Sequence, residues 1–287
     1  MVKIRSIFVV AICFCLYGKM FAAIDIGVTI PPQSEPVLAV MGTNANVRVL
    51  MEGNQNPHFF RPSARRLSDL ADCEIYFMMN FPGEEEVAKK FMHIGKPRLM
   101  SMHSEKEKDM HHGHHHGHHH GHGATCGGAG VDFHYWLSPI KLKEFANTVC
   151  EEACKLMPEQ QEYFRSNLRS YEQRCEKVLK EGRAAIAAAG VTHILSYHPA
   201  LGTYASAMGI TQITIEKDGK APTLRVVADV VTESRKLGIH TLFAQNSGEA
   251  EQSKVIVNKL GVEVITVKLL VPEPLSLIEA ITAALVR

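Results

Sequence analysis

A histidine-rich run is the part of this chain whose residue types point most directly to chemistry. Nine of the sixteen histidines fall in it: His111, His112, His114, His115, His116, His118, His119, His120 and His122. Glycine recurs at every fourth place and nothing apolar accompanies it, so we expect an insertion outside the folded core. Imidazoles have an ordinary pKa of about 6.5 and can bind divalent cations at neutral pH. The run predicts an auxiliary metal-binding loop over 103–129; the alternative is a solvated, pH-responsive loop.

Three further histidines lie in loops or at the ends of predicted strands. His58 follows a predicted strand, His134 comes just after the histidine run, and His198 follows a second predicted strand. A single loop histidine is more often solvated or a capping residue, but three such residues beside the run favour one shared site. Three neutral imidazoles suit Zn²⁺ as tetrahedral ligands with the fourth position open.

The composition is typical of a soluble globular protein and gives no electrostatic case for binding nucleic acid. Its 287 residues are enough for two domains, and 31 basic against 30 acidic residues leave a net charge of +1. Residues 1–23 combine Lys3 and Arg5 with a short apolar stretch and small residues at their end. This pattern predicts a cleavable signal peptide and a periplasmic protein, with an uncleaved anchor as the alternative.

Two of the cysteines share one face of a predicted helix. Cys150 and Cys154 are four residues apart, a spacing that permits a poor disulfide or a weak metal site. We expect two buried small side chains instead.

Apolar strands alternate with helical patterns along the chain, which predicts an α/β fold with mainly parallel sheets. We expect strands at 24–30, 46–51, 73–79, 98–100, 193–197, 211–215, 241–244 and 263–267. We expect helices at 34–41, 63–71, 84–93, 140–157, 159–189, 199–208, 224–237, 249–260 and 275–286. The pattern implies lobes over 24–157 and 190–287, joined by one long rigid helix within 158–189. Ligands of such folds bind at the carboxyl ends of the strands, here in the crevice between lobes.

The segments around the three histidines resemble a known family. Asn56–Ser63, Asp132–Pro139 and Tyr197–Tyr204 are similar to segments of the zinc-specific cluster A-I substrate-binding proteins of metal ABC importers. The resemblance spans nearly all of the mature chain and includes the place of the histidine run. It implies that His58, His134 and His198 hold Zn²⁺ as the transported ligand. It also implies a monomer that delivers zinc to a membrane ABC permease and is not an enzyme.

The fourth zinc ligand departs from the family pattern. Many relatives have an aspartate at the position where this chain has Lys268, and an ammonium cannot bind a metal. The resemblance therefore implies three histidines plus water, chloride or a loop histidine. Glu216 is a weaker ligand candidate, and its alternative role is a solvated acid at a strand end.

Two other function classes remain open from the residues. A zinc-dependent hydrolytic enzyme could also use three histidines and a metal-bound water, although no H-E-x-x-H motif is present. A passive periplasmic zinc buffer or adhesin could act through the histidine run alone.

Overall fold

The computed structural model describes residues 22–51, 60–81, 83–94, 97–102, 132–216 and 222–287. Residues 1–21 of the expected signal peptide, His58 and the histidine run lie outside this part of the chain. Among the helices described, none is both long and apolar enough to cross a membrane.

The N-terminal lobe contains a four-stranded parallel sheet in the order β2-β1-β3-β4. Its strands are β1 (Ile24–Val28), β2 (Ala45–Val49), β3 (Ile75–Met78) and β4 (Arg98–Ser101). The pairing places Val28 between Val49 and Phe77. Gly27 permits close packing here, because a Cβ atom at this position would come within 2.8 Å of the Tyr76 ring.

The C-terminal lobe repeats this topology in a second parallel sheet, ordered β6-β5-β7-β8. Its strands are β5 (His193–Ser196), β6 (Thr211–Thr214), β7 (Thr241–Ala244) and β8 (Glu263–Thr266). In both sheets the chain order reverses beside the first strand, β1 or β5. In open α/β sheets, ligands bind beyond the carboxyl ends of the strands at such a reversal.

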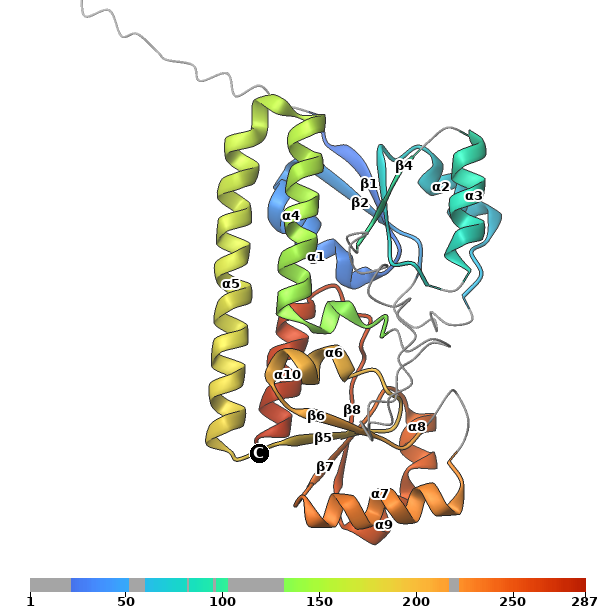
Figure 1. Cartoon of the computed structure of the whole chain (residues 1–287). Helices are drawn as coiled ribbons and strands as arrows, with labels where there is room; N and C mark the ends of the chain where they lie inside the picture. Colours follow the sequence, from blue (N-terminus) through green and yellow to red (C-terminus); the bar gives the residue numbers. More distant parts are fainter. Residues whose placement is uncertain (1–21, 52–59, 82, 95–96, 103–131, 217–221) are drawn as a thin grey trace, which may run out of the picture.

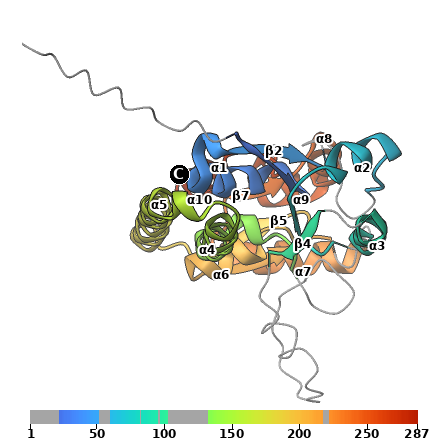
Figure 2. The same cartoon turned by 90° about the horizontal axis from the view of Figure 1, so that it is seen from above.

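Helices cover both faces of each sheet (Figures 1 and 2). On the N-terminal sheet, one face packs α1 (Ser34–Met41), α4 (Pro139–Leu156) and α5 (Gln161–Ala188), and the other packs α2 (Ala64–Ala71) and α3 (Glu84–Ile94). On the C-terminal sheet, α6 (Gly202–Met208) and α10 (Pro274–Leu285) pack against one face. The other face is covered by α7 (Leu224–Lys236) and α9 (Lys254–Leu260). The short helix α8 (Ser247–Gln252) comes just before α9. The described residues also form short 3₁₀ turns: η1 (Pro31–Gln33), η2 (Gly42–Asn44), η6 (Tyr135–Leu137) and η7 (Pro158–Gln160).

The two lobes share one hydrophobic core. Phe145 of α4, Phe164 of α5 and Ile278 of α10 are fully buried in the same cluster of side chains. Trp136 in η6 donates from Nε1 to the Leu269 carbonyl at 2.9 Å, which links the two halves of the sequence. The 28 residues of α5 extend about 42 Å beside both lobes (Figure 1). The predicted fold, two parallel α/β lobes joined by a long helix, is confirmed.

Two details of the predicted elements are wrong. The helix expected over 249–260 is divided into α8 and α9 at Ser253, whose hydroxyl donates back to the Glu249 carbonyl at 2.7 Å. The helix expected from Pro199 begins at Gly202, because Ala200 N donates to the His198 carbonyl and closes a turn first.

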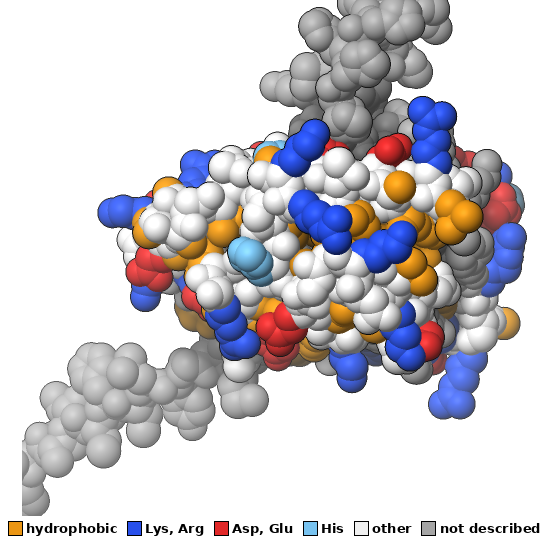
Figure 3. All heavy atoms as spheres, turned by 90° about the horizontal axis from the view of Figure 1, so that it is seen from below, with side chains coloured by type: hydrophobic (Ala, Val, Ile, Leu, Met, Phe, Trp, Pro, Cys, Tyr) orange, Lys and Arg blue, Asp and Glu red, His pale blue; other side chains and the backbone are white. Residues whose placement is uncertain are grey.

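The outer surface of the C-terminal lobe mixes cationic and apolar side chains (Figure 3). Leu224 at the start of α7 and Val255 on α9 are among the exposed apolar residues of this lobe. Lys and Arg side chains lie beside apolar ones across this face, although the whole chain carries a net charge of only +1.

Candidate metal centre

His134 lies in the tightly held segment 132–138, just before α4. Ser138 caps α4 by accepting from Lys141 N at 3.4 Å, and Pro139 occupies the first helical turn. Trp136 is buried between the lobes, so η6 has little freedom to move. The His134 side chain is itself 5 % exposed and therefore has a fixed position.

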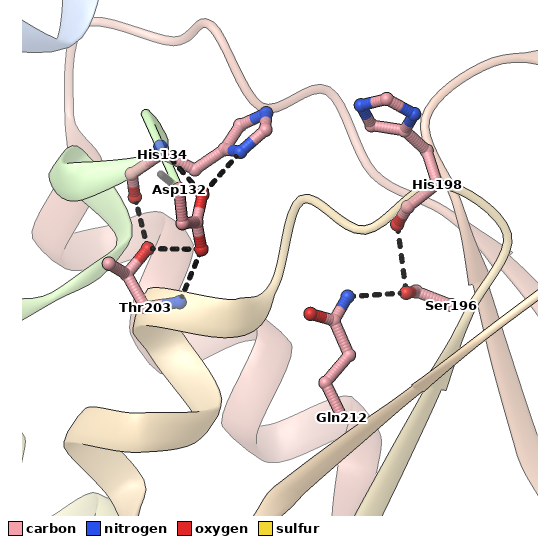
Figure 4. A network of polar contacts seen from close by, with 6 residues as sticks. All are labelled: Asp132, His134, Ser196, His198, Thr203 and Gln212. Atoms are coloured by element: carbon pink, nitrogen blue, oxygen red, sulfur yellow. Dashed lines mark hydrogen bonds and ion pairs between the residues drawn. The ribbon is translucent and has the colours of Figure 1, made fainter. Parts of the chain in front are cut away.

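Asp132 fixes the orientation of the His134 ring. Its Oδ1 accepts from His134 N at 2.9 Å and contacts His134 Nδ1 at 2.8 Å. Its Oδ2 accepts from Thr203 N at the start of α6 at 2.9 Å, and the Thr203 hydroxyl donates to the His134 carbonyl at 2.5 Å. One carboxylate thus holds the histidine and connects the two lobes (Figure 4).

The close approach of Asp132 to α6 depends on Gly202. A Cβ atom at Gly202 would lie 2.5 Å from Asp132 Oδ2 and 3.2 Å from Gln212 Oε1. Real side chains do not tolerate the shorter of these contacts, so any larger residue would displace the carboxylate or the helix.

His198 follows the carboxyl end of β5, at the chain reversal of the C-terminal sheet. Its carbonyl accepts from the Ser196 hydroxyl at 2.8 Å, and that hydroxyl accepts from Gln212 Nε2 at 2.7 Å. Its ring Nδ1 lies 3.1 Å from Glu216 Oε2. The backbone at His198 is therefore held from β5 and β6 (Figure 4), and Glu216, just after β6, contacts the ring.

The two histidine rings face each other across the boundary between the lobes. Their centroids are 5.8 Å apart and their planes make an angle of 77°. Two imidazoles on one tetrahedral zinc, with Zn–N bonds of about 2.0–2.1 Å, would have centroids about 5 Å apart. The observed separation is close to this value, so a small adjustment brings both rings onto one ion.

The carboxylates determine which ring nitrogen can bind a metal. Asp132 contacts Nδ1 of His134 and Glu216 contacts Nδ1 of His198. A carboxylate accepts a hydrogen bond from Nδ1–H, so the lone pair of each neutral ring is on Nε2. Carboxylate–histidine–zinc arrangements orient metal ligands in this way and raise their basicity.

The neutral form of His198 is favoured by its surroundings. Burial and the neighbouring His134 ring lower the pKa of His198, and the contact with Glu216 opposes this effect only in part. A metal ligand must be deprotonated, and this lowered pKa extends the neutral form of the ring toward acid pH.

The structure brings together two of the three predicted primary ligands, His134 and His198. His58 and the histidines of the run lie outside the described residues. Within the part of the chain that the structure describes, no group of three His, Cys, Asp or Glu side chains could hold a metal ion. His93 and His240 are exposed.

Three polar residues bear on the sequence expectations for this centre. Glu216 is not a solvated acid, because its side chain is only 15 % exposed and contacts His198. Asp132 was missed, although an aspartate two residues before a histidine is a common local hydrogen-bonding pattern. Lys268 is an exposed residue just after β8.

Known proteins show similarity over most of this chain. The model of the family described as zinc-uptake complex component A, periplasmic, matches residues 26–284. The zinc-binding protein AdcA of Streptococcus pyogenes is 23 % identical over 252 residues, which cover 82 % of this chain and 48 % of the relative. The chain therefore spans about half the length of the curated AdcA relatives that it matches.

Solved structures share the fold. A crystal structure of ZnuA superposes with a TM-score of 0.78 at 22 % identity, covering 92 % of this chain and 98 % of the other. The periplasmic zinc-binding protein TroA from Treponema pallidum gives a TM-score of 0.74 at 14 % identity, again covering 92 % and 98 %. Two parallel α/β lobes, a long helix between them and a family match over nearly the whole folded chain agree: this chain belongs to the family of zinc-uptake complex component A.

Proposed function

We propose that this chain captures Zn²⁺ in the periplasm and delivers it, as a monomer, to an ABC-type permease for import. The observation that carries the proposal is the His134–His198 pair, in which each Nδ1 contacts a carboxylate. Both Nε2 lone pairs are then directed by fixed rings, as a tight site for a borderline-soft cation requires.

His58 is the third ligand in this proposal. It follows β2 in the sequence, and the carboxyl ends of parallel strands share one edge of a sheet. Imidazole in place of a carboxylate at His198 favours zinc over manganese, because manganese prefers oxygen ligands. The histidine run is an auxiliary segment that collects zinc. Lys268 cannot bind the metal, so the fourth ligand is water, chloride or a histidine of the run.

Binding rather than hydrolysis fits the polar groups around the pair. A hydrolytic zinc site needs a general base facing the metal-bound water. Asp132 and Glu216, the two nearby carboxylates, instead contact the Nδ1 atoms on the far side of each ring from Nε2.

Zinc titration of single variants tests this ligand set. We expect His58→Ala, His134→Ala and His198→Ala each to weaken the tightest site by at least about tenfold, because each removes one metal bond. His93→Ala and His240→Ala are matched controls at exposed histidines and should leave the affinity unchanged. Equal losses in all five variants would contradict the assignment. Growth under zinc limitation tests delivery of zinc to the permease. A strain that lacks this protein should recover growth with the wild type but not with His198→Ala.

A further inference from the structure

Two thiols lie together on α4, far from the histidine pair. Cys150 is buried, Cys154 is half-buried, and the Cys154 thiol lies near enough to raise the pKa of Cys150. Both pack against the core between α4 and α5. Cys150 is eleven residues after Pro139, so about 16 Å of helix separate this pair from the start of α4 beside His134.

The spacing of the two thiols disfavours a disulfide and suits a bridging ion. Side chains at i and i+4 of a helix have Cβ atoms about 5–6 Å apart. A disulfide needs a Cβ–Cβ distance of about 3.5–4.5 Å, so forming one would deform α4. A linear sulfur–metal–sulfur unit with bonds of about 2.3 Å separates the sulfurs by about 4.6 Å, which the undistorted helix can accommodate.

The donor set and its surroundings select the kind of ion. Thiolates and thioethers bind soft cations of the Cu⁺ type, whereas structural Zn²⁺ sites are four-coordinate and need more ligands than two thiolates. Met157, three residues after Cys154 at the C-cap of α4, is buried in the same core and offers a further soft sulfur. Two thiolates and one monovalent ion have a net charge of −1. Arg165 of α5 lies near enough to lower the pKa of Cys150 and can compensate this charge.

We propose that Cys150 and Cys154 form a second metal site, which binds one soft monovalent cation such as Cu⁺ or Ag⁺ between their two sulfurs. Binding replaces two S–H bonds by two sulfur–metal bonds and releases two protons to solvent, and no electrons are transferred. Burial raises the pKa of Cys150 to about 11, so both protons must be displaced and only a strongly thiophilic ion can do so.

Silver titration of the full, zinc-loaded chain tests the proposal. Ag⁺ is the probe because it is soft, monovalent and stable to oxidation. We expect a thiolate-to-silver ultraviolet absorption that saturates at one equivalent, with two protons released per ion. Both signals should be lost in Cys150→Ser/Cys154→Ser and retained in Cys73→Ser/Cys175→Ser, which changes two buried thiols elsewhere.

Alkylation of the wild type keeps the test valid if a serine variant fails to fold. One equivalent of Ag⁺ should slow the alkylation of Cys154, mapped by mass spectrometry, relative to the protein without silver. Unchanged silver absorption in Cys150→Ser/Cys154→Ser would overturn the proposal. A Cys150–Cys154 disulfide in protein isolated without reductant would overturn it too.

Discussion

Replacing Asp132 by asparagine probes the contact that both orients His134 and joins the lobes. Asparagine has nearly the same shape but only one acceptor oxygen, and its amide nitrogen is a donor. The carboxylate accepts from two backbone N–H groups and contacts His134 Nδ1, so asparagine cannot match all three. The most favourable rotamer keeps the amide oxygen near His134, where it accepts from the backbone N–H and from Nδ1–H. The amide nitrogen then faces Thr203 N–H, so that two donors oppose each other.

The expected cost follows from this mismatch. An unmatched, largely buried N–H group costs about 1–3 kcal/mol, and the Asp132 side chain is only 15 % exposed. We therefore expect Asp132→Asn to lower the free energy of unfolding of the metal-free protein by about 1–3 kcal/mol. Mutation of the carboxylate that holds a metal ligand weakens metal binding by about 10- to 100-fold, and we expect the neutral amide at position 132 to raise the zinc Kd by this factor.

Two measurements and one control separate a local effect on zinc from general destabilisation. Urea unfolding of the metal-free protein gives the stability change, and competition with a zinc chelator gives the Kd of the tightest site. Asp25→Asn is the matched control, because Asp25 accepts from Asn46 and Arg48 at the edge of the N-terminal sheet. It should alter stability without altering zinc affinity. An unchanged Kd in Asp132→Asn, or equal Kd changes in both variants, would refute the reasoning.

Three further predictions concern the surroundings of the centre. Gly202→Ala, whose Cβ would lie 2.5 Å from Asp132 Oδ2, should lower both stability and zinc affinity, whereas the control Gly248→Ala should leave the zinc Kd unchanged in the same titration. Deleting 103–131 should reduce the total zinc bound in calorimetry but keep one tight site; loss of that site would make the histidine run the receptor. The pKa of His198 is lowered in the folded state, so its neutral ring contributes fully to the stability of the metal-free protein above about pH 6.5. This contribution is lost as the pH falls through the lowered pKa. Urea unfolding should therefore show the wild type losing stability relative to His198→Gln between about pH 7 and about pH 5, and a constant difference would contradict the shift.

Much of the fold can be predicted from the sequence because it is built from local, periodic patterns. The helix Ser34–Met41 and the strand Thr241–Ala244 agree with prediction to the residue. The division at Ser253 could not be predicted, because the 249–260 pattern is compatible with one helix until the serine hydroxyl competes for a backbone carbonyl.

The centre was only partly predictable, for a different physical reason. His134 and His198 stand out by residue type and position, and the structure brings their rings within 5.8 Å between centroids. The roles of Asp132 and Glu216 depend on contacts between segments far apart in sequence, such as Asp132 with Thr203. Glu216 could not be distinguished from a solvated acid until the packing of β5 against β6 was known.

Crystallography of the zinc-loaded protein, with anomalous diffraction recorded at the zinc edge, tests the central claim most directly. We predict one strong zinc peak within about 2.0–2.1 Å of Nε2 of both His134 and His198, with His58 as a third ligand. Asp132 and Glu216 should remain on the Nδ1 atoms. Zinc bound through Nδ1, or a strongest peak that lacks His134 and His198, would contradict the account.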